Sequence, residues 1–174
     1  RSRRLHGLVA RAVAERFRAA GVPVIAPQAA FYLYPDFGVW REWLGEAHGV
    51  TTGPELTRML LDRYGMGVLP AVEFGESTHA LRVRVATSLL YGESEAQRYS
   101  ALAAEDPTAL PWIRAHLDRI SEVLIREATG NPYLERFLTS VEHAVRRFGR
   151  STFTQAGRSA EAVEEHFGIL EAIA

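Results

Sequence analysis

Apolar residues at the start of the chain recur every three or four positions, with arginines between them, until Gly21 and Pro23 end the pattern. This is the spacing of one face of an α-helix, because side chains three and four residues apart lie on the same side. The pattern therefore predicts an amphipathic surface helix. Its apolar positions are Leu5, Leu8, Val9, Ala12, Val13 and Phe17.

A second helix is predicted over residues 53–64. Thr52 and Glu55 form a capping box, in which each side chain can accept a hydrogen bond from the other residue's free backbone N–H. Pro54 is tolerated in the first turn of a helix, and Gly65 can adopt the left-handed conformation that ends one. Both ends of this helix are therefore marked in the sequence.

Three segments have extended patterns. Residues 30–34 are an aromatic run next to a proline, residues 67–72 are mostly apolar, and residues 80–87 alternate between apolar and polar positions. Residues 36–53 hold two tryptophans among glycines and polar residues, which indicates a loop with a single helical turn. A few short strands among helices predict an α+β fold, in which helices cover a small sheet.

From Glu93 onward the pattern is helical throughout. We expect a break at residues 105–107 and a new helix at Asn131, because asparagine is a good N-cap and the following proline suits the first helical position. This change of character predicts two parts, an α+β domain over residues 1–115 and an all-helical segment over residues 116–174.

Composition excludes several classes of function. The chain has 174 residues, 47% of them apolar, which is enough for one domain or two small ones. Its formal net charge of −1 gives no overall attraction to nucleic acid or to an anionic membrane. The absence of cysteine excludes thiolate metal sites and cysteine nucleophiles. All 20 basic residues are arginine, so chemistry that needs a lysine amine is excluded as well.

Four motifs follow one another in the first part of the chain. They are PQAAFYLYPDF from Pro27, GPEL from Gly53, YGMGVLPAVEFG from Tyr64 and LRVRVA from Leu81. Their order and spacing resemble the C-terminal small domain of class I/II, fold-type I aminotransferases, which use pyridoxal phosphate. The resemblance covers about residues 5–125.

This resemblance implies roles for two side chains. In the family the strand motif supplies an arginine that binds the α-carboxylate of the amino-acid or keto-acid substrate, and the matching residue is Arg82. Arginine suits this role because its planar fork pairs with both carboxylate oxygens. Tyr32 lies on the strand that approaches the substrate side chain in the family; the alternative for Tyr32 is packing in the core. The family also implies a homodimer.

The missing lysine limits what this chain could catalyse. Aminotransfer requires a Schiff base between a lysine and pyridoxal phosphate, and the family carries that lysine in a large domain that has no counterpart here. We therefore expect a fragment of a pyridoxal-phosphate-dependent amino-acid aminotransferase that is inactive alone.

The second part of the chain carries two different motifs, EATGNPYL from Glu127 and EHFGILEAI from Glu165. They are similar to the helical effector-binding domain, called FCD, of FadR-type GntR transcription regulators. The similarity covers about residues 118–174.

The similarity to FCD implies a divalent-metal site. In that family an aspartate and a histidine four residues apart precede the first motif, and a histidine in the second motif joins them. The matching residues are Asp118, Glu122 and His166, and Glu122 departs from the family pattern because it stands in place of a histidine. The alternative is a solvated acidic pair beside an exposed histidine.

Three hypotheses for function follow. The first is the aminotransferase fragment. The alternative is part of a metal-dependent ligand-sensing domain whose effector is a small carboxylic acid. The third is a folded remnant with neither activity.

We expect no nucleic-acid binding by this chain, no membrane span, and a cytoplasmic location. We also expect both ends to be truncated. A natural fusion, a truncation and a composite of two genes are all compatible with the order of the two parts.

Overall fold

The first helix, α1 (Ser2–Ala19), forms where the apolar spacing predicts it. The computed structural model describes residues 1–129, which belong to one compact unit, Arg1–Gly130. The buried face of α1 repeats at helical spacing and includes Leu5, Val9, Val13 and Phe17. The chain then turns at Gly21, which adopts a φ of +77° that an L-amino acid with a side chain rarely adopts.

The sheet has three short antiparallel strands in the order β1-β3-β2. They are β1 (Tyr32–Leu33), β2 (Leu69–Pro70) and β3 (Val83–Ala86). In β3 the valines are buried and the alternate positions are partly exposed, as the alternating pattern predicts. The strands are shorter than the predicted segments, because prolines follow β1 and end β2 and lack the N–H that a strand donates to its neighbour.

The segment between β1 and β2 is more helical than the sequence analysis predicts. A 3₁₀ turn, η1 (Phe37–Trp40), leads into α2 (Arg41–His48), so the prediction of a loop with one helical turn is wrong. Leu44 is the single fully buried residue of α2, and one buried position gives no periodic signal. By contrast, α3 (Gly53–Tyr64) has the predicted bounds and the predicted capping box.

From the end of the sheet to Thr129 the chain is built from helices, which agrees with the predicted helical character of this stretch. Short turns η2 (Ala71–Phe74) and η3 (Thr87–Tyr91) follow β2 and β3. The helices are α4 (Glu95–Ala103), the 3₁₀ turn η4 (Pro107–Ala109) and α5 (Pro111–Thr129). The helix expected from Asn131 lies outside the described residues. Because α5 runs across residue 115, the division into 1–115 and 116–174 stays a prediction about domain identity.

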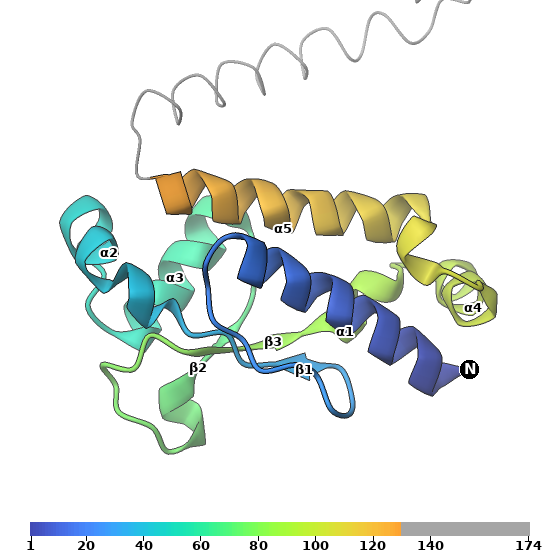
Figure 1. The fold of residues 1–174 in the computed structure, drawn as a ribbon, viewed down its shortest axis with the longest axis horizontal. Helices are drawn as coiled ribbons and strands as arrows, with labels where there is room; N and C mark the ends of the chain where they lie inside the picture. The colour runs from blue at the N-terminus through green and yellow to red at the C-terminus, as the bar shows by residue number, and fades with distance from the viewer. Residues whose placement is uncertain (130–174) are drawn as a thin grey trace, which may run out of the picture. The chain divides into compact units, whose positions relative to one another are not determined.

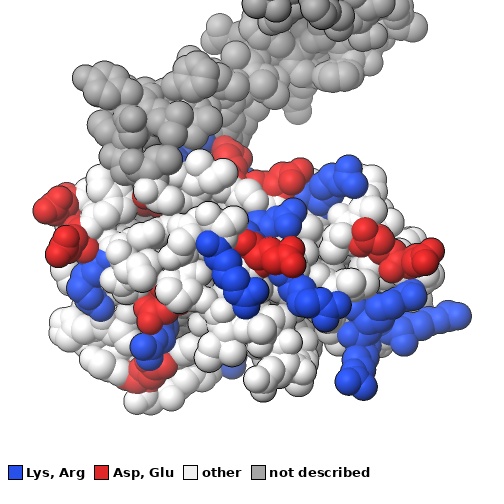
Figure 2. Space-filling view, in the orientation of Figure 1, with Lys and Arg blue, Asp and Glu red and all other residues white. Residues whose placement is uncertain are grey.

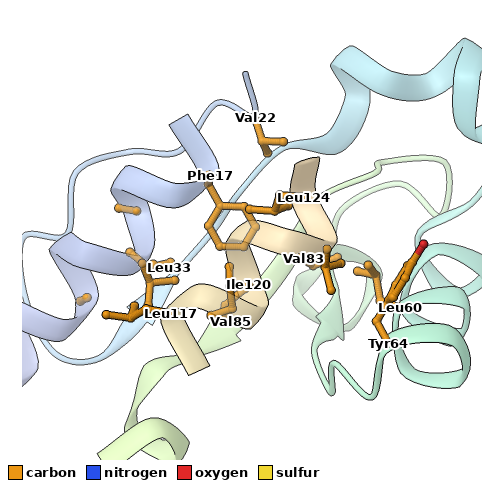
Figure 3. Close-up of a cluster of buried hydrophobic side chains, with 14 of the residues drawn as sticks. Phe17, Val22, Leu33, Leu60, Tyr64, Val83, Val85, Leu117, Ile120 and Leu124 are labelled. Carbon is orange, nitrogen blue, oxygen red and sulfur yellow. The ribbon is translucent and has the colours of Figure 1, made fainter. Parts of the chain in front are cut away.

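The core lies between two helices and the sheet. Figure 1 shows α1 and α5 lying side by side on one side of the sheet, and these two helices contact each other. Figure 3 shows the side chains that meet there, with Phe17 from α1 packed among residues of α5 and the strands. Each fully buried side chain of this size contributes roughly 1.5–3 kcal/mol by leaving water. Other members of the cluster are Leu33, Val83, Val85, Leu117, Ile120 and Leu124.

The described residues therefore form a mixed fold, mostly helical with a small three-stranded sheet. This confirms the α+β class. Among these residues, none of the helices has the length and apolar character needed to cross a membrane.

Candidate functional site

The acidic residues predicted as metal ligands lie on α5. Asp118 and Glu122 are separated by one helical turn, and Asp118 is exposed. Both oxygens of Glu122 accept hydrogen bonds from arginines of the same helix, Oε2 from Nη1 of Arg119 at 3.0 Å and Oε1 from Nη2 of Arg126 at 2.9 Å. The negative charge of Glu122 is therefore already balanced by two guanidinium groups.

The described residues do not fit a metal ion by themselves. No group of three histidine, aspartate or glutamate side chains within residues 1–129 could hold one. A cation at Glu122 would have to compete with two arginines for the same oxygens. His166, the third predicted ligand, lies outside the described residues. A metal site at Asp118, Glu122 and His166 thus stays a prediction.

A buried polar cluster holds the C-terminal end of α5. Glu127 is only 4% exposed, and its Oε2 accepts a hydrogen bond from Nε2 of His48 at 2.8 Å. The hydroxyl of Tyr64 donates to its other oxygen, Oε1. Behind His48, Nη1 of Arg63 lies 2.9 Å from Nδ1, and the ring of Trp43 meets the imidazole edge-on. The cluster ties α5 to both α2 and α3.

The hydrogen bonds of this cluster fix the tautomer of His48. An arginine side chain can only donate, so Nδ1 of His48 accepts from Arg63 and the imidazole proton lies on Nε2. That proton is donated to Glu127, whose two oxygens are therefore both satisfied. A buried carboxylate with two donors is stable, and the same carboxylate without them would be costly. These hydrogen bonds hold the last turn of α5 against α2 and α3.

In the sequence, Glu127 stands out only as the first residue of the EATGNPYL motif. A signal was present nevertheless, since Glu127 continues the spacing of Ile120, Val123 and Leu124, which are all buried on α5. An acidic residue in line with a buried stripe requires partners inside the protein. The sequence could not identify them, because His48 and Tyr64 lie far away in the chain and one of them is on the helix that the pattern missed.

Arg82 lies on the strand side that faces away from the core and is held by two carboxylates. Its Nε donates to Oδ2 of Asp36 and its Nη1 to Oε2 of Glu76, both at 2.8 Å. The bond to Asp36, with the charges of both acids, raises the pKa of Arg82 above its ordinary value. A ligand carboxylate would have to share or displace these two partners.

Tyr32 and Arg82 line separate pockets on the described surface. Tyr32 is 44% exposed, so the alternative of packing in the core does not describe it. Its ring lies against the guanidinium of Arg84, at 4.7 Å from the ring centroid, and Phe74 contacts that guanidinium at 4.3 Å. Binding of a substrate by Arg82 and Tyr32 is not tested by these contacts and rested on the aminotransferase resemblance.

Comparisons with known proteins change the interpretation of the chain. Neither a search of curated proteins nor a search of solved structures gives a match. The family model that matches is the FCD domain, and nothing supports an aminotransferase small domain or a role for pyridoxal phosphate. The hypothesis of an aminotransferase fragment is therefore wrong. The expectations of a homodimer and of no nucleic-acid binding stay predictions.

The match also agrees in position with the second set of motifs. It begins just before α4, includes all of α5, and extends through the end of the sequence. The match to the FCD domain therefore covers residues 92–174.

Proposed function

We propose that residues 92–174 form the effector-binding part of a GntR/FadR-type transcription regulator. The observation that carries this proposal is the FCD match over those residues. Within it, α5 is a long, ordered helix whose buried face packs on α1 and whose exposed Asp118 occupies the aspartate position of the family pattern. The effector is a small carboxylic acid.

The described residues support this function by holding α5 in place. The cluster of Glu127, His48 and Tyr64 fixes the last turn of α5, while its apolar face is buried further back along the helix. A binding site needs such a rigid support, because a loosely held side chain loses entropy each time it binds a ligand. The proposal therefore assigns Asp118 and His166 to the ligand site and Glu127 to its support.

Calorimetric titration of the 1–174 chain tests the proposal. The titrants are mono-, di- and tricarboxylic acids from acetate to citrate, each with and without added Zn²⁺ or Mn²⁺. We expect saturable binding of at least one acid, weakened about tenfold or more by Asp118→Ala and by His166→Ala, since each removes a charged or ligating partner. Asp62→Ala, which removes an exposed acid from α3, is the matched control and should bind as the wild type does.

Two outcomes would overturn the proposal. One is the absence of saturable binding for every acid, with and without the metal ions. The other is binding that neither Asp118→Ala nor His166→Ala weakens. The titrations with and without metal ions test separately whether the site requires a divalent ion. Binding that persists in the presence of a chelator shows that it does not.

A further inference from the structure

A cavity of about 510 Å³ lies between the first half of α1 and the loop before β1. Figure 1 shows this loop next to the N-terminal half of α1, and Figure 2 shows basic side chains gathered at the corner where α1 begins. The lining includes two arginines and a histidine and no acidic residue. The residues that line it are Arg3, His6, Gly7, Arg11, Pro27, Gln28, Ala29 and Ala30.

A glycine lies between the two arginines that line this cavity. Arg3, Gly7 and Arg11 are four residues apart and share one face of α1. A Cβ built on Gly7 would lie 3.3 Å from Nη1 of Arg11 and 3.8 Å from its Cζ. The guanidinium of Arg11 therefore folds back over Gly7, toward the turn that carries Arg3. Glycine inside a helix costs about 1 kcal/mol relative to alanine, and here it makes room for a cation.

Neither arginine is neutralised by another residue of the described chain. Among the described residues, Arg3 and Arg11 have no ion pair or side-chain hydrogen bond, whereas Arg4 between them donates to the carbonyl of Ala104. Two like charges brought to one cavity repel each other unless an anion lies between them.

The third basic group is held in a fixed orientation. Nδ1 of His6 is hydrogen bonded to the hydroxyl of Tyr91 at 2.8 Å, and the imidazole packs against the rings of Phe31 and Tyr91 with centroids 5.4 Å away in each case. Its other nitrogen, Nε2, has no hydrogen-bond partner in the described part of the chain. His6 can therefore offer Nε2 to a ligand without losing the contacts that orient it.

The loop opposite α1 is strained at one position. Ala30 has a φ of +59°, and it is the single residue other than glycine with positive φ within residues 1–129. A left-handed conformation costs an alanine roughly 1–2 kcal/mol. Such strain persists where the surrounding structure requires it, and ligand-binding loops are frequent examples.

We propose that this cavity binds a dianionic oxyanion group, as found in a phosphate monoester or a dicarboxylate. The guanidinium group of an arginine can bind two oxygens of such a group at once. Two guanidinium groups without a carboxylate partner favour a ligand that carries two negative charges. The site lies outside residues 92–174, so it is separate from the effector site proposed above and does not depend on it.

The test titrates the 1–174 chain with inorganic phosphate and, in a second arm, with malonate, each against sodium chloride at the same ionic strength. We expect saturable binding of at least one dianion. The dianion that binds with the higher affinity identifies the ligand class, phosphate or dicarboxylate. Arg3→Ala and Arg11→Ala should each weaken it about tenfold or more, because each removes a charged hydrogen-bond donor. Arg58→Ala, at an exposed arginine of α3, is the matched control and should leave the affinity unchanged.

Gly7→Ala separates a binding role from a structural one. The added methyl group would lie 3.3 Å from Nη1 of Arg11, so the guanidinium must shift by a few tenths of an ångström and the affinity should fall. The thermal midpoint of the ligand-free chain should instead stay level or rise, because alanine favours the helix. A merely structural role would move both readouts together.

The proposal is overturned if neither dianion binds saturably, or if Arg58→Ala weakens binding as much as Arg11→Ala does. Arg11→Lys, which keeps the charge and removes the fork, serves in place of Arg11→Ala if that variant fails to fold. Asp118→Ala should leave this site unchanged, which distinguishes a failure here from a failure of the effector site.

Discussion

Glu127 is a buried carboxylate whose two oxygens both depend on side chains from other helices. Glu127→Ala leaves His48 and Tyr64 without their shared acceptor and should lower the free energy of unfolding by about 3 kcal/mol. Urea denaturation followed by circular dichroism measures this change. Glu122→Ala is the control, because Glu122 is partly exposed and its ion pairs join neighbouring turns of one helix, where each contributes less than about 1 kcal/mol. Equal losses in the two variants would contradict the assignment of Glu127 as the anchor of α5.

Ala30 provides a second test with the opposite sign. Because its φ is +59°, Ala30→Gly should cost no stability and can gain up to about 1 kcal/mol, although glycine also adds freedom to the unfolded chain. Ala12→Gly, inside α1, should instead lose about 1 kcal/mol. Thermal unfolding of both variants measures the difference. A clear loss in Ala30→Gly would show that the loop before β1 is not strained.

The sequence marks both ends of α3. The capping box at its N-terminus leads to a prediction about how stability depends on pH. The pKa of Glu55 is lowered to about 2, first because the backbone N–H of Thr51 donates to its carboxylate and then because of the hydroxyls of Thr52 and Thr51. A lowered pKa means that the charged form stabilises the folded state. This contribution is complete above about pH 5 and is lost as the pH falls toward 2.

Titration of the Glu55 carboxyl by NMR measures this directly. The midpoint should lie near pH 2 in the wild type and rise in Thr51→Ala, which removes the hydroxyl that donates to Oε2. A wild-type midpoint near the ordinary glutamate value of about 4.3 would show that the capping box does not form in solution.

The helices show which parts of the fold can be predicted from sequence. The bounds of α3 follow from local signals, because Thr52 and Gly65 act on neighbouring backbone groups. The helix α2 could not be predicted in the same way, since Leu44 is its single fully buried residue and no periodic stripe marks it. The partners of Glu127 could not be predicted from the sequence either. Its hydrogen bonds join α5 to His48 and Tyr64, which lie about 60 to 80 positions earlier in the chain.

The compact unit and the family match divide the chain at different places. The FCD match begins at residue 92, whereas the compact unit continues to Gly130 and includes α4 and α5. The apolar face of α5, which includes Ile113, Leu117 and Leu124, is buried in the same core as α1. The first part of the match is thus structurally part of the N-terminal unit.

This arrangement predicts how fragments of the chain behave. A fragment of residues 1–130 should fold cooperatively, since it keeps every residue of the core described here. A fragment of residues 92–174 should not, because α5 loses the surface of α1 that covers its apolar side chains. Tryptophan fluorescence during urea denaturation distinguishes the two. A sigmoidal transition in the 92–174 fragment and none in the 1–130 fragment would contradict the shared core.

The proposed effector site is tested most directly by one set of calorimetric titrations, in which the wild type, Asp118→Ala and Arg11→Ala are compared with the same series of carboxylic acids. The account predicts saturable binding of at least one acid by the wild type, a loss of about tenfold or more in Asp118→Ala, and, when that acid is a monocarboxylate, full affinity in Arg11→Ala. Binding that is equal in wild type and Asp118→Ala, or no saturable binding by any acid, would contradict it.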